Sequence, residues 1–158
     1  MNNQYWSDCL YQLFLSSLQS CTFASLTDGE LRHELDNLIK RAIARFKFPK
    51  VSLEYAWDDE LDDDNLPKGY YFINEVGMKE ILVLLAWAKV YWVEYQLSRE
   101  ENYENVYADK DVKTFSSGNL LTSIKNAMES LTLFARKTEE EYSRVNIEGK
   151  PAIGDINV

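Results

Sequence analysis

The residues with the greatest potential for chemistry are the carboxylates of one short acidic run, where six Asp or Glu side chains stand within seven consecutive positions. A calcium loop of the EF-hand type needs oxygen ligands at alternating positions, Gly at the sixth position and Glu at the twelfth. Counted from Asp58, those two positions hold Asp63 and Gly69, and a start at Asp59 or Asp62 fits no better. We therefore exclude an EF-hand and expect either a solvated loop tip or a functional acidic surface. The acidic residues of the run are Asp58, Asp59, Glu60, Asp62, Asp63 and Asp64.

Residues suited to catalysis are scarce. His33 is the only histidine, and its offset of two positions from Leu31 and Leu35 turns it toward the polar face of a helix. The chain contains no nucleophile elbow, phosphate loop, dinucleotide-binding or zinc-protease motif. Carboxylates are abundant, but none stands in a segment that we predict to bury it and raise its pKa. We predict a protein that is not an enzyme and that holds no cofactor and no metal ion.

A basic block directly precedes the acidic run, and no acidic residue interrupts it between Asp36 and Glu54. The dipole of a helix favours cations at its C-terminus, which is sufficient to explain such a block. A subunit with one basic and one acidic end is also suited to heterologous, head-to-tail contacts that close into rings. We keep both interpretations, and the second makes the block a ring contact. Its members are Lys40, Arg41, Arg45, Lys47 and Lys50.

Composition indicates a single globular domain, residues 1–158, that is 46% hydrophobic and 13% aromatic. The net charge of −9 argues against a sequence-independent hold on nucleic acid. Cys9 and Cys21 would lie about 18 Å apart on one helix, too far for a disulfide, so we expect free thiols in a reducing compartment. We expect neither a signal peptide nor a membrane span, because the longest apolar run, residues 81–88, is far shorter than a span.

Four segments carry helical signals. The first covers residues 4–22, and the second begins with a capping box formed by Thr27 and Glu30 and is closed by Pro49. The third covers residues 77–102, and the fourth begins near residue 116 and frays near residue 146. In the fourth, Ser116 is the predicted N-cap, and Phe115 and Leu120 form a hydrophobic staple.

The third helix is apolar on every side, which means that neighbouring elements or another subunit must cover it. Four helices cannot easily hide it in so short a chain, so we expect part of its surface to be subunit interface. An apolar C-terminal tail, residues 147–158, is too short to pack on itself and is a second candidate interface. The candidate interface residues are Trp87, Trp92, Tyr95, Ile153, Ile156 and Val158.

Residues 51–75 differ from these helices because apolar and polar residues alternate from Val51 to Trp57, as in a strand. Residues 70–74 form a candidate returning strand, which places the acidic run at the tip of a hairpin. The predicted fold class is therefore all-α: a four-helix bundle with a long central apolar helix, a hairpin-like acidic insertion between the second and third helices, and an extended C-terminal tail.

Residues 78–97 (MKEILVLLAWAKVYWVEYQL) and 107–120 (YADKDVKTFSSGNL) resemble the neck or head–tail connector (adaptor) proteins of tailed bacteriophages. Residues 42–49 are similar to the end of the second helix of that family, and the likeness covers about two-thirds of the chain, from Leu38 onward. Its motifs are capping and packing motifs, which limits their specificity. The matching positions are Glu80, Ile81, Lys110, Asp111, Lys113, Ser116, Asn119 and Tyr142.

The resemblance implies a structural virion protein of the phage neck, made in the host cytoplasm, in a ring of twelve copies beneath the portal. It implies contacts with the portal protein and with a tail or head-closure protein, while DNA passes through the lumen without specific binding. It carries over no catalytic residue; Lys110, Asp111 and Lys113 would order a loop, Phe115 would staple and Ser116 would cap the last helix. Residues 4–22 have no match and the acidic tip carries more charge than expected, so the position of the tip relative to the ring stays open.

Two other classes remain open. Small acidic helical proteins also act as DNA mimics or as nuclease inhibitors of the immunity-protein type. Such a protein would be a monomer or dimer whose binding to a basic enzyme depends steeply on salt. That interpretation explains the acidic run but leaves the apolar third helix and the tail unexplained. A helical interaction protein of another kind is the third possibility.

Overall fold

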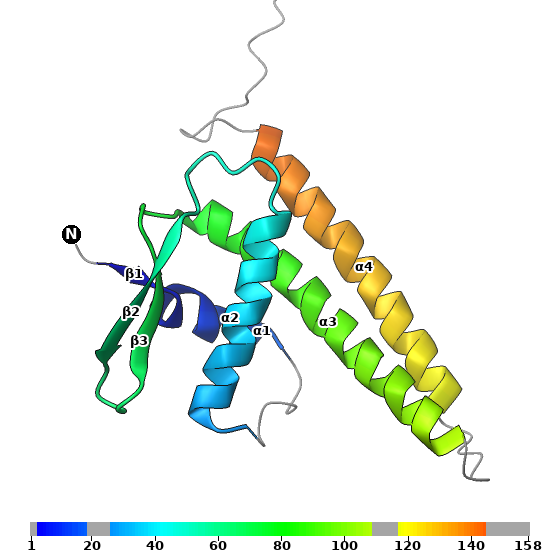
Figure 1. Cartoon of the computed structure of the whole chain (residues 1–158). Coiled ribbons are helices and arrows are strands. Elements are labelled where there is room, and N and C mark those ends of the chain that lie inside the picture. Colours follow the sequence, from blue (N-terminus) through cyan, green and yellow to red (C-terminus); the bar gives the residue numbers. More distant parts are fainter. Residues whose placement is uncertain (1–2, 19–25, 109–116, 145–158) are drawn as a thin grey trace, which may run out of the picture.

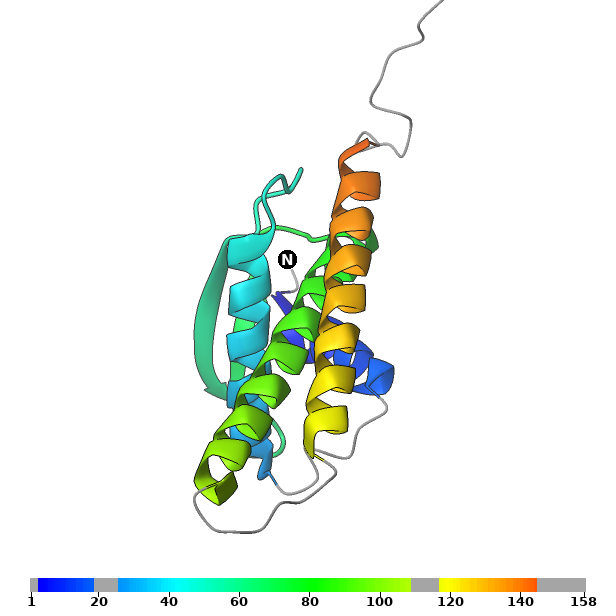
Figure 2. The same ribbon diagram turned by 90° about the vertical axis from the view of Figure 1, so that its right-hand side faces the viewer.

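The computed structural model describes residues 3–18, 26–108 and 117–144 (Figure 1). The two views in Figures 1 and 2 show α2 standing between a small sheet and an antiparallel pair formed by α3 and α4. The elements, in chain order, are β1 (Gln4–Tyr5), a π-helical turn (Ser7–Tyr11), α1 (Gln12–Ser17), α2 (Asp28–Arg45), β2 (Tyr55–Leu61), β3 (Pro67–Phe72), α3 (Met78–Ala108) and α4 (Ser117–Arg144).

The predicted all-α four-helix bundle is wrong, because the described segments combine helices with a three-stranded antiparallel sheet of order β1-β3-β2. The predicted insertion is a hairpin, and its strands are part of this sheet. The third strand comes from the N-terminus, where Gln4 pairs with Phe72 and Tyr5 with Tyr71. The chain is therefore a mixed α and β fold in which the sheet covers one side of the helices.

The predicted first helix, residues 4–22, begins instead with a strand and a π-helical turn. The side-chain amide of Gln4 donates to the carbonyl of Val76 at 3.0 Å and accepts from its N–H at 2.9 Å. Trp6 is fully buried and stacks on Tyr70, with ring centroids 4.9 Å apart. Burying a Trp contributes far more stability than a helical residue gains from its propensity. This anchoring holds the start of the chain against β3.

The predicted start of α2 is confirmed. Thr27 accepts from the backbone N–H of Glu30, and the Glu30 carboxylate accepts from the backbone N–H of Thr27, which completes the capping box. The helix ends at Arg45, since Phe46 is already extended, three residues before Pro49. Its buried stripe faces α3 and includes Leu35, Leu38, Ile39 and Ala42.

The β2–β3 hairpin is irregular at the acidic run. Tyr55 pairs with Phe72 and Trp57 with Tyr70, but the register shifts between Asp58 and Leu61. The run is therefore divided between the end of β2 and the connecting turn, rather than confined to the tip. Two residues of the hairpin have positive φ angles, Asn65 in the turn at 57° and Gly69 within β3, opposite Asp58, at 88°.

The core explains much of the apolar character of α3, although Leu82 remains 51% exposed. Around Val83, Leu84 and Trp87 the helix is covered by the N-terminal segment, by α2 and by α4, so these residues are at most 3% exposed. One cluster of buried side chains joins these elements with the sheet. Within the described segments, no helix is both long and apolar enough to cross a membrane.

Candidate functional site

Three of the six carboxylates in the acidic run stabilise the hairpin. Asp58 accepts from the phenol of Tyr5, and Glu60 forms a 2.6 Å ion pair with Lys68 on the facing strand. Asp62 accepts from the backbone N–H groups of Asp64 and Leu66, both at 3.0 Å. The hydrogen bond from Tyr5 is the main reason that the pKa of Asp58 is lowered, and the bond from the N–H of Leu66 is the main reason for Asp62.

The other three carboxylates, of Asp59, Asp63 and Asp64, are solvent-exposed and take no part in a hydrogen bond or ion pair within the described segments. Asp62, the first residue of the turn, is tied to α2 by a 2.7 Å ion pair with Arg32. The end of the hairpin therefore presents three unengaged carboxylates, one from β2 and two from the turn, next to the first turns of α2.

The basic block lies along the second half of α2 and the loop that follows it. Four of its five cations lie over an aromatic ring of another element, a contact worth about 0.5–2 kcal/mol. Of the five, Lys47 alone has no such ring contact among the described residues. The distances from cation to ring centroid are 3.9 Å for Lys40 over Tyr70, 4.1 Å for Arg41 over Tyr91, 4.3 Å for Arg45 over Trp87 and 5.1 Å for Lys50 over Tyr142.

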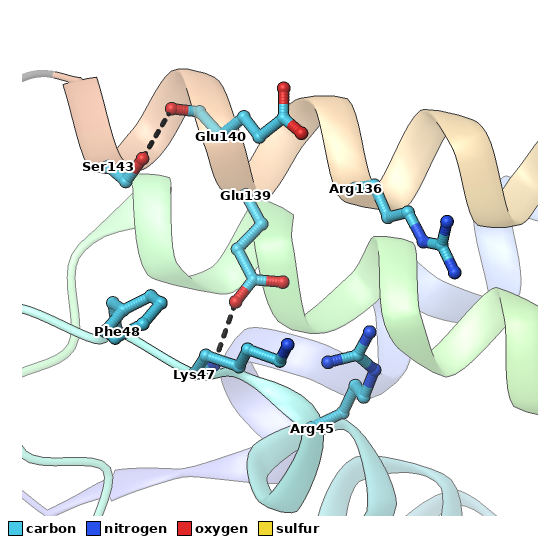
Figure 3. A pocket seen from close by; sticks show the side chains of 7 residues that line it. All are labelled: Arg45, Lys47, Phe48, Arg136, Glu139, Glu140 and Ser143. Atoms are coloured by element: carbon cyan, nitrogen blue, oxygen red, sulfur yellow. Dashed lines mark hydrogen bonds between the residues drawn. The ribbon is translucent and has the colours of Figure 1, made fainter.

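An open pocket of about 380 Å³ lies between the end of α2 and the last turns of α4. Figure 3 shows Arg45 and Lys47 extending into it from one side and Arg136 from the other. Arg45 is half-buried, whereas Lys47 and Arg136 are exposed. The pocket is lined by Arg45, Lys47, Phe48, Arg136, Glu139, Glu140 and Ser143.

Glu139 lines the pocket beside these cations, and both of its carboxylate oxygens are engaged by N–H donors. Its carboxylate accepts from the backbone N–H of Lys47 at 2.8 Å and from the indole N–H of Trp87 at 3.0 Å. In Figure 3 the carboxylate of Glu140 points away from the three cations. Phe48, 69% exposed, forms an apolar rim beside them. The arrangement suits a ligand that carries carboxylate or other oxyanion groups.

Buried carboxylates are present, contrary to the sequence-based expectation. Glu80 is 8% exposed and accepts from the phenol of Tyr142 at 2.7 Å, while Asp36 is 7% exposed and accepts from the phenol of Tyr11. Burial is the main cause that raises the pKa of Asp36. Two features of the sequence pointed to this burial. Glu80 stands directly before the apolar run of residues 81–88, and Asp36 directly follows Leu35.

Neither buried pair forms an open site. Each carboxylate already has a phenol donor, and neither Asp36 nor Glu80 lines the pocket at the end of α2. No group of three or more His, Cys, Asp or Glu side chains that could hold a metal ion occurs in the described parts of the chain. Both pairs are best understood as links between elements.

The candidate interface residues of α3 have different positions. Trp87 and Trp92 are 3% and 6% exposed, so the chain's own core covers both indoles, and only Tyr95, 42% exposed, remains accessible. Asn119 is exposed in the first turn of α4. The remaining candidates lie outside the described residues: Lys110, Asp111, Lys113, Phe115, Ser116, Ile153, Ile156 and Val158.

An apolar surface on α4 was not predicted from the sequence. Leu133 and Phe134 are 66% and 58% exposed. Ala135 is fully buried in the core, so Leu133, two positions earlier, lies on the opposite side of the helix. No described element covers this outer side, because α4 packs mainly along α3. The surface formed by Leu133 and Phe134, here called the outer α4 patch, was detectable from the sequence only as two apolar residues outside the stripe.

The α3–α4 pair also projects beyond the rest of the fold (Figure 1). In this projecting part, the stripe of α4 that faces α3 is only half-buried, whereas Ala135 and Tyr142 in the other half of α4 are buried. A pair of helices cannot cover an apolar stripe on its own. The half-buried positions are Leu121, Ile124, Met128 and Leu131.

No family model, curated protein or solved structure matches the chain.

Proposed function

We propose that the protein is a ring-forming structural subunit of the neck of a tailed bacteriophage, where it joins the portal to a tail or head-closure protein. In this function the subunits, about twelve in number, surround a channel through which DNA passes without specific binding. The protein performs no catalysis and would be located in the virion. The sequence resemblance to connector proteins supports this proposal, and so does the distribution of exposed apolar surface.

The observation that carries the proposal is the uncovered apolar surface of the α3–α4 pair. The outer α4 patch exposes Leu133 and Phe134 on one side, and the projecting half of the pair leaves its apolar stripe half-buried. Covering apolar surface gains about 25 cal/mol per Å². A ring gives each subunit two neighbours, so that one covers the outer α4 patch and the other covers the half-buried stripe, which single subunits in water leave exposed. This arrangement favours lateral assembly of helix pairs, as a ring requires.

The charge of the subunit supports the proposed DNA channel. With a net charge of −9, the subunit offers no broad basic surface to the phosphate backbone. Four of the five cations in the basic block also lie over the protein's own aromatic rings. A lumen built from such subunits repels DNA rather than binding it, which allows the genome to slide through.

The test is the mass of the purified chain, measured by light scattering from low concentration up to the solubility limit, with negative-stain images of every large species. We expect closed rings with a central hole. A chain that remains monomeric or dimeric at all concentrations contradicts the proposal. It would favour the acidic DNA mimic or nuclease inhibitor, for which tight, salt-sensitive binding to a basic nuclease is the direct measurement.

A matched pair of variants tests which surface assembles the ring. Phe134 and Ile73 are both 58% exposed, but Phe134 belongs to the outer α4 patch and Ile73 follows β3. We expect Phe134→Glu to remove the rings and Ile73→Glu to keep them, with both variants folded by circular dichroism. Rings that survive Phe134→Glu would show that the outer α4 patch is not the lateral contact.

A further inference from the structure

The pocket at the end of α2 holds three cations that converge without a partner. Arg45 at the end of α2, Lys47 in the loop that follows it and Arg136 of α4 extend into the same space (Figure 3). No ion pair involves any of the three within the described segments. Like charges repel at such short range, and Glu139, whose two oxygens already accept from N–H groups, offsets only part of the three positive charges. An added anionic group between the cations is therefore favourable.

Arg45 is held in position for binding. Its guanidinium lies 4.3 Å from the ring centroid of Trp87, so one face is stacked and its N–H edge stays free for an acceptor. Trp87 is itself fixed by the hydrogen bond from its indole N–H to Glu139 at 3.0 Å. A guanidinium that is already ordered loses less conformational entropy when it binds a carboxylate.

The hairpin turn of the same chain carries a complementary set of charges. Asp59, Asp63 and Asp64 are exposed and have no partner in the described structure, while Asp62 ties the turn to Arg32 of α2. These three carboxylates, Asp59 near the end of β2 and Asp63 and Asp64 in the turn, therefore give the end of the hairpin three free negative charges. Three acceptors match the three cations of the pocket in number and opposite charge.

The turn cannot reach the pocket of its own chain. Arg32, which binds the turn, and Arg45, which lines the pocket, are thirteen residues apart on α2, about 20 Å along the helix. Figure 1 shows the hairpin turn near the start of α2 and the final turns of α4 near its end. A contact between the two surfaces must therefore join two molecules, and it is heterologous because each molecule contributes a different surface.

We propose that the acidic end of the hairpin of one subunit, through Asp59, Asp63 and Asp64, docks into the Arg45, Lys47 and Arg136 pocket of the next copy. The contact gives each subunit a donor end and an acceptor end, which sets the direction of assembly around the ring. It rests on the proposed ring function and adds a specific contact to it. The apolar surface of α3 and α4 supplies area, whereas this contact selects the orientation of neighbours.

Charge reversal gives a sharp test, because the two surfaces can be altered independently. The pocket variant carries Lys47→Glu and Arg136→Glu and keeps Arg45 stacked on Trp87. The turn variant carries Asp59→Lys and Asp63→Lys. Each variant alone would present two surfaces of like charge, so we expect loss of rings at concentrations where the wild type is fully assembled. The control variant Lys137→Glu also reverses a positive charge. Lys137 follows Arg136 in the sequence but does not line the pocket, so this variant should assemble normally.

Mixing provides the decisive measurement. In an equal mixture of the pocket and turn variants, every contact joins opposite charges if the two kinds of subunit alternate, so rings should return. A chain that carries both sets of reversals should likewise form rings by itself. Circular dichroism melts verify that each variant is folded, and the restored assembly rules out misfolding as the cause of loss.

The outcomes separate this proposal from the function on which it rests. If the wild type forms rings and either reversed variant also forms them, the charge contact is wrong and the ring function stands. If both variants fail and their mixture also fails, the contact is again wrong, because opposite charges did not restore it. If the wild type forms no ring, both proposals fall.

Discussion

The phenol of Tyr142 donates a 2.7 Å hydrogen bond to the buried carboxylate of Glu80, although the two residues are 62 positions apart. The same phenol oxygen accepts from the backbone N–H of Lys50 at 2.7 Å. One side chain near the end of α4 thus links the start of α3 to the loop after α2. Burial is the main cause that raises the pKa of Tyr142 to about 12, so the phenol stays a donor at physiological pH.

Removing this phenol should be costly. In Tyr142→Phe, the Glu80 carboxylate, 8% exposed, loses its donor, and the Lys50 N–H loses its acceptor. An unsatisfied buried group costs about 1–3 kcal/mol, so we expect the free energy of unfolding to fall by about that amount in urea titrations. Tyr95→Phe, at an exposed tyrosine, is the control and should change it by less than about 0.5 kcal/mol. Equal stability of the two variants would contradict the structural role of the link.

The ionisation of Asp36 should lower the free energy of unfolding as the pH rises. A surface acid whose pKa is lowered in the fold has the opposite effect. Burial raises its pKa, and the hydrogen bond from Tyr11 and the nearby cations oppose this only in part. The folded state therefore holds the proton more tightly than the unfolded state, whose pKa is near 3.8. The contribution to stability is complete below that pH and is lost as pH rises through the higher pKa of the folded state.

The measurement is urea unfolding of the wild type and Asp36→Asn from pH 3.5 to pH 7. Asn keeps an oxygen that accepts from Tyr11 but cannot ionise. We expect the wild type to lose stability relative to Asp36→Asn as the pH rises. If the free energy of unfolding of the wild type instead rises relative to that of Asp36→Asn over this range, the fold favours the ionised carboxylate.

Two glycines should respond oppositely to replacement by Ala. Gly69 has a φ of +88°, which L residues rarely adopt, although a Cβ there would meet nothing closer than 3.8 Å. The cost of Gly69→Ala is therefore conformational, and we expect a loss of about 1 kcal/mol or more in thermal or urea unfolding. Gly29 lies in the first turn of α2 with no heavy atom within 4 Å of a Cβ, so Gly29→Ala should stabilise by about 0.4–1 kcal/mol. Equal effects at both sites would contradict the positive φ of Gly69.

The capping box at the start of α2 should also be measurable. Thr27→Ala removes the acceptor for the N–H of Glu30, and we expect a loss of about 0.5–2 kcal/mol in the free energy of unfolding. Thr27→Ser retains the hydroxyl and should restore most of that loss. If Ser and Ala destabilise equally, the hydroxyl is not the source of the stability.

Much of the helical part was predictable because its signals are local. The capping box lies within four residues, from Thr27 to Glu30, and the all-round apolar character of α3 lies within one segment. Alternation from Val51 to Trp57 correctly indicated an extended segment, although β2 begins only at Tyr55. The fold class was wrong because β1 consists of two residues, too few for any periodic pattern, and owes its conformation to pairing with β3.

The candidate site was predictable only in composition. The acidic run and the basic block were visible in the sequence, but their division into engaged and free charges was not. Asp62 is engaged because Arg32 lies beside it, and Arg45 is stacked because Trp87 lies beneath it. Arg136, which completes the pocket, belongs to another helix and lay outside the predicted basic block.

The sequence by itself determined the starts of α2 and α3, the hairpin and the separation of acidic from basic charge, since each depends on neighbours within a few positions. Only the tertiary structure decided which charges remain free. Partners such as Lys50 and Tyr142 are 92 residues apart, and no periodicity of a local segment can encode such a distance. Packing also decided that Trp87 and Trp92 are core residues while Leu133 and Phe134 are exposed, because burial depends on which elements happen to face each side of a helix.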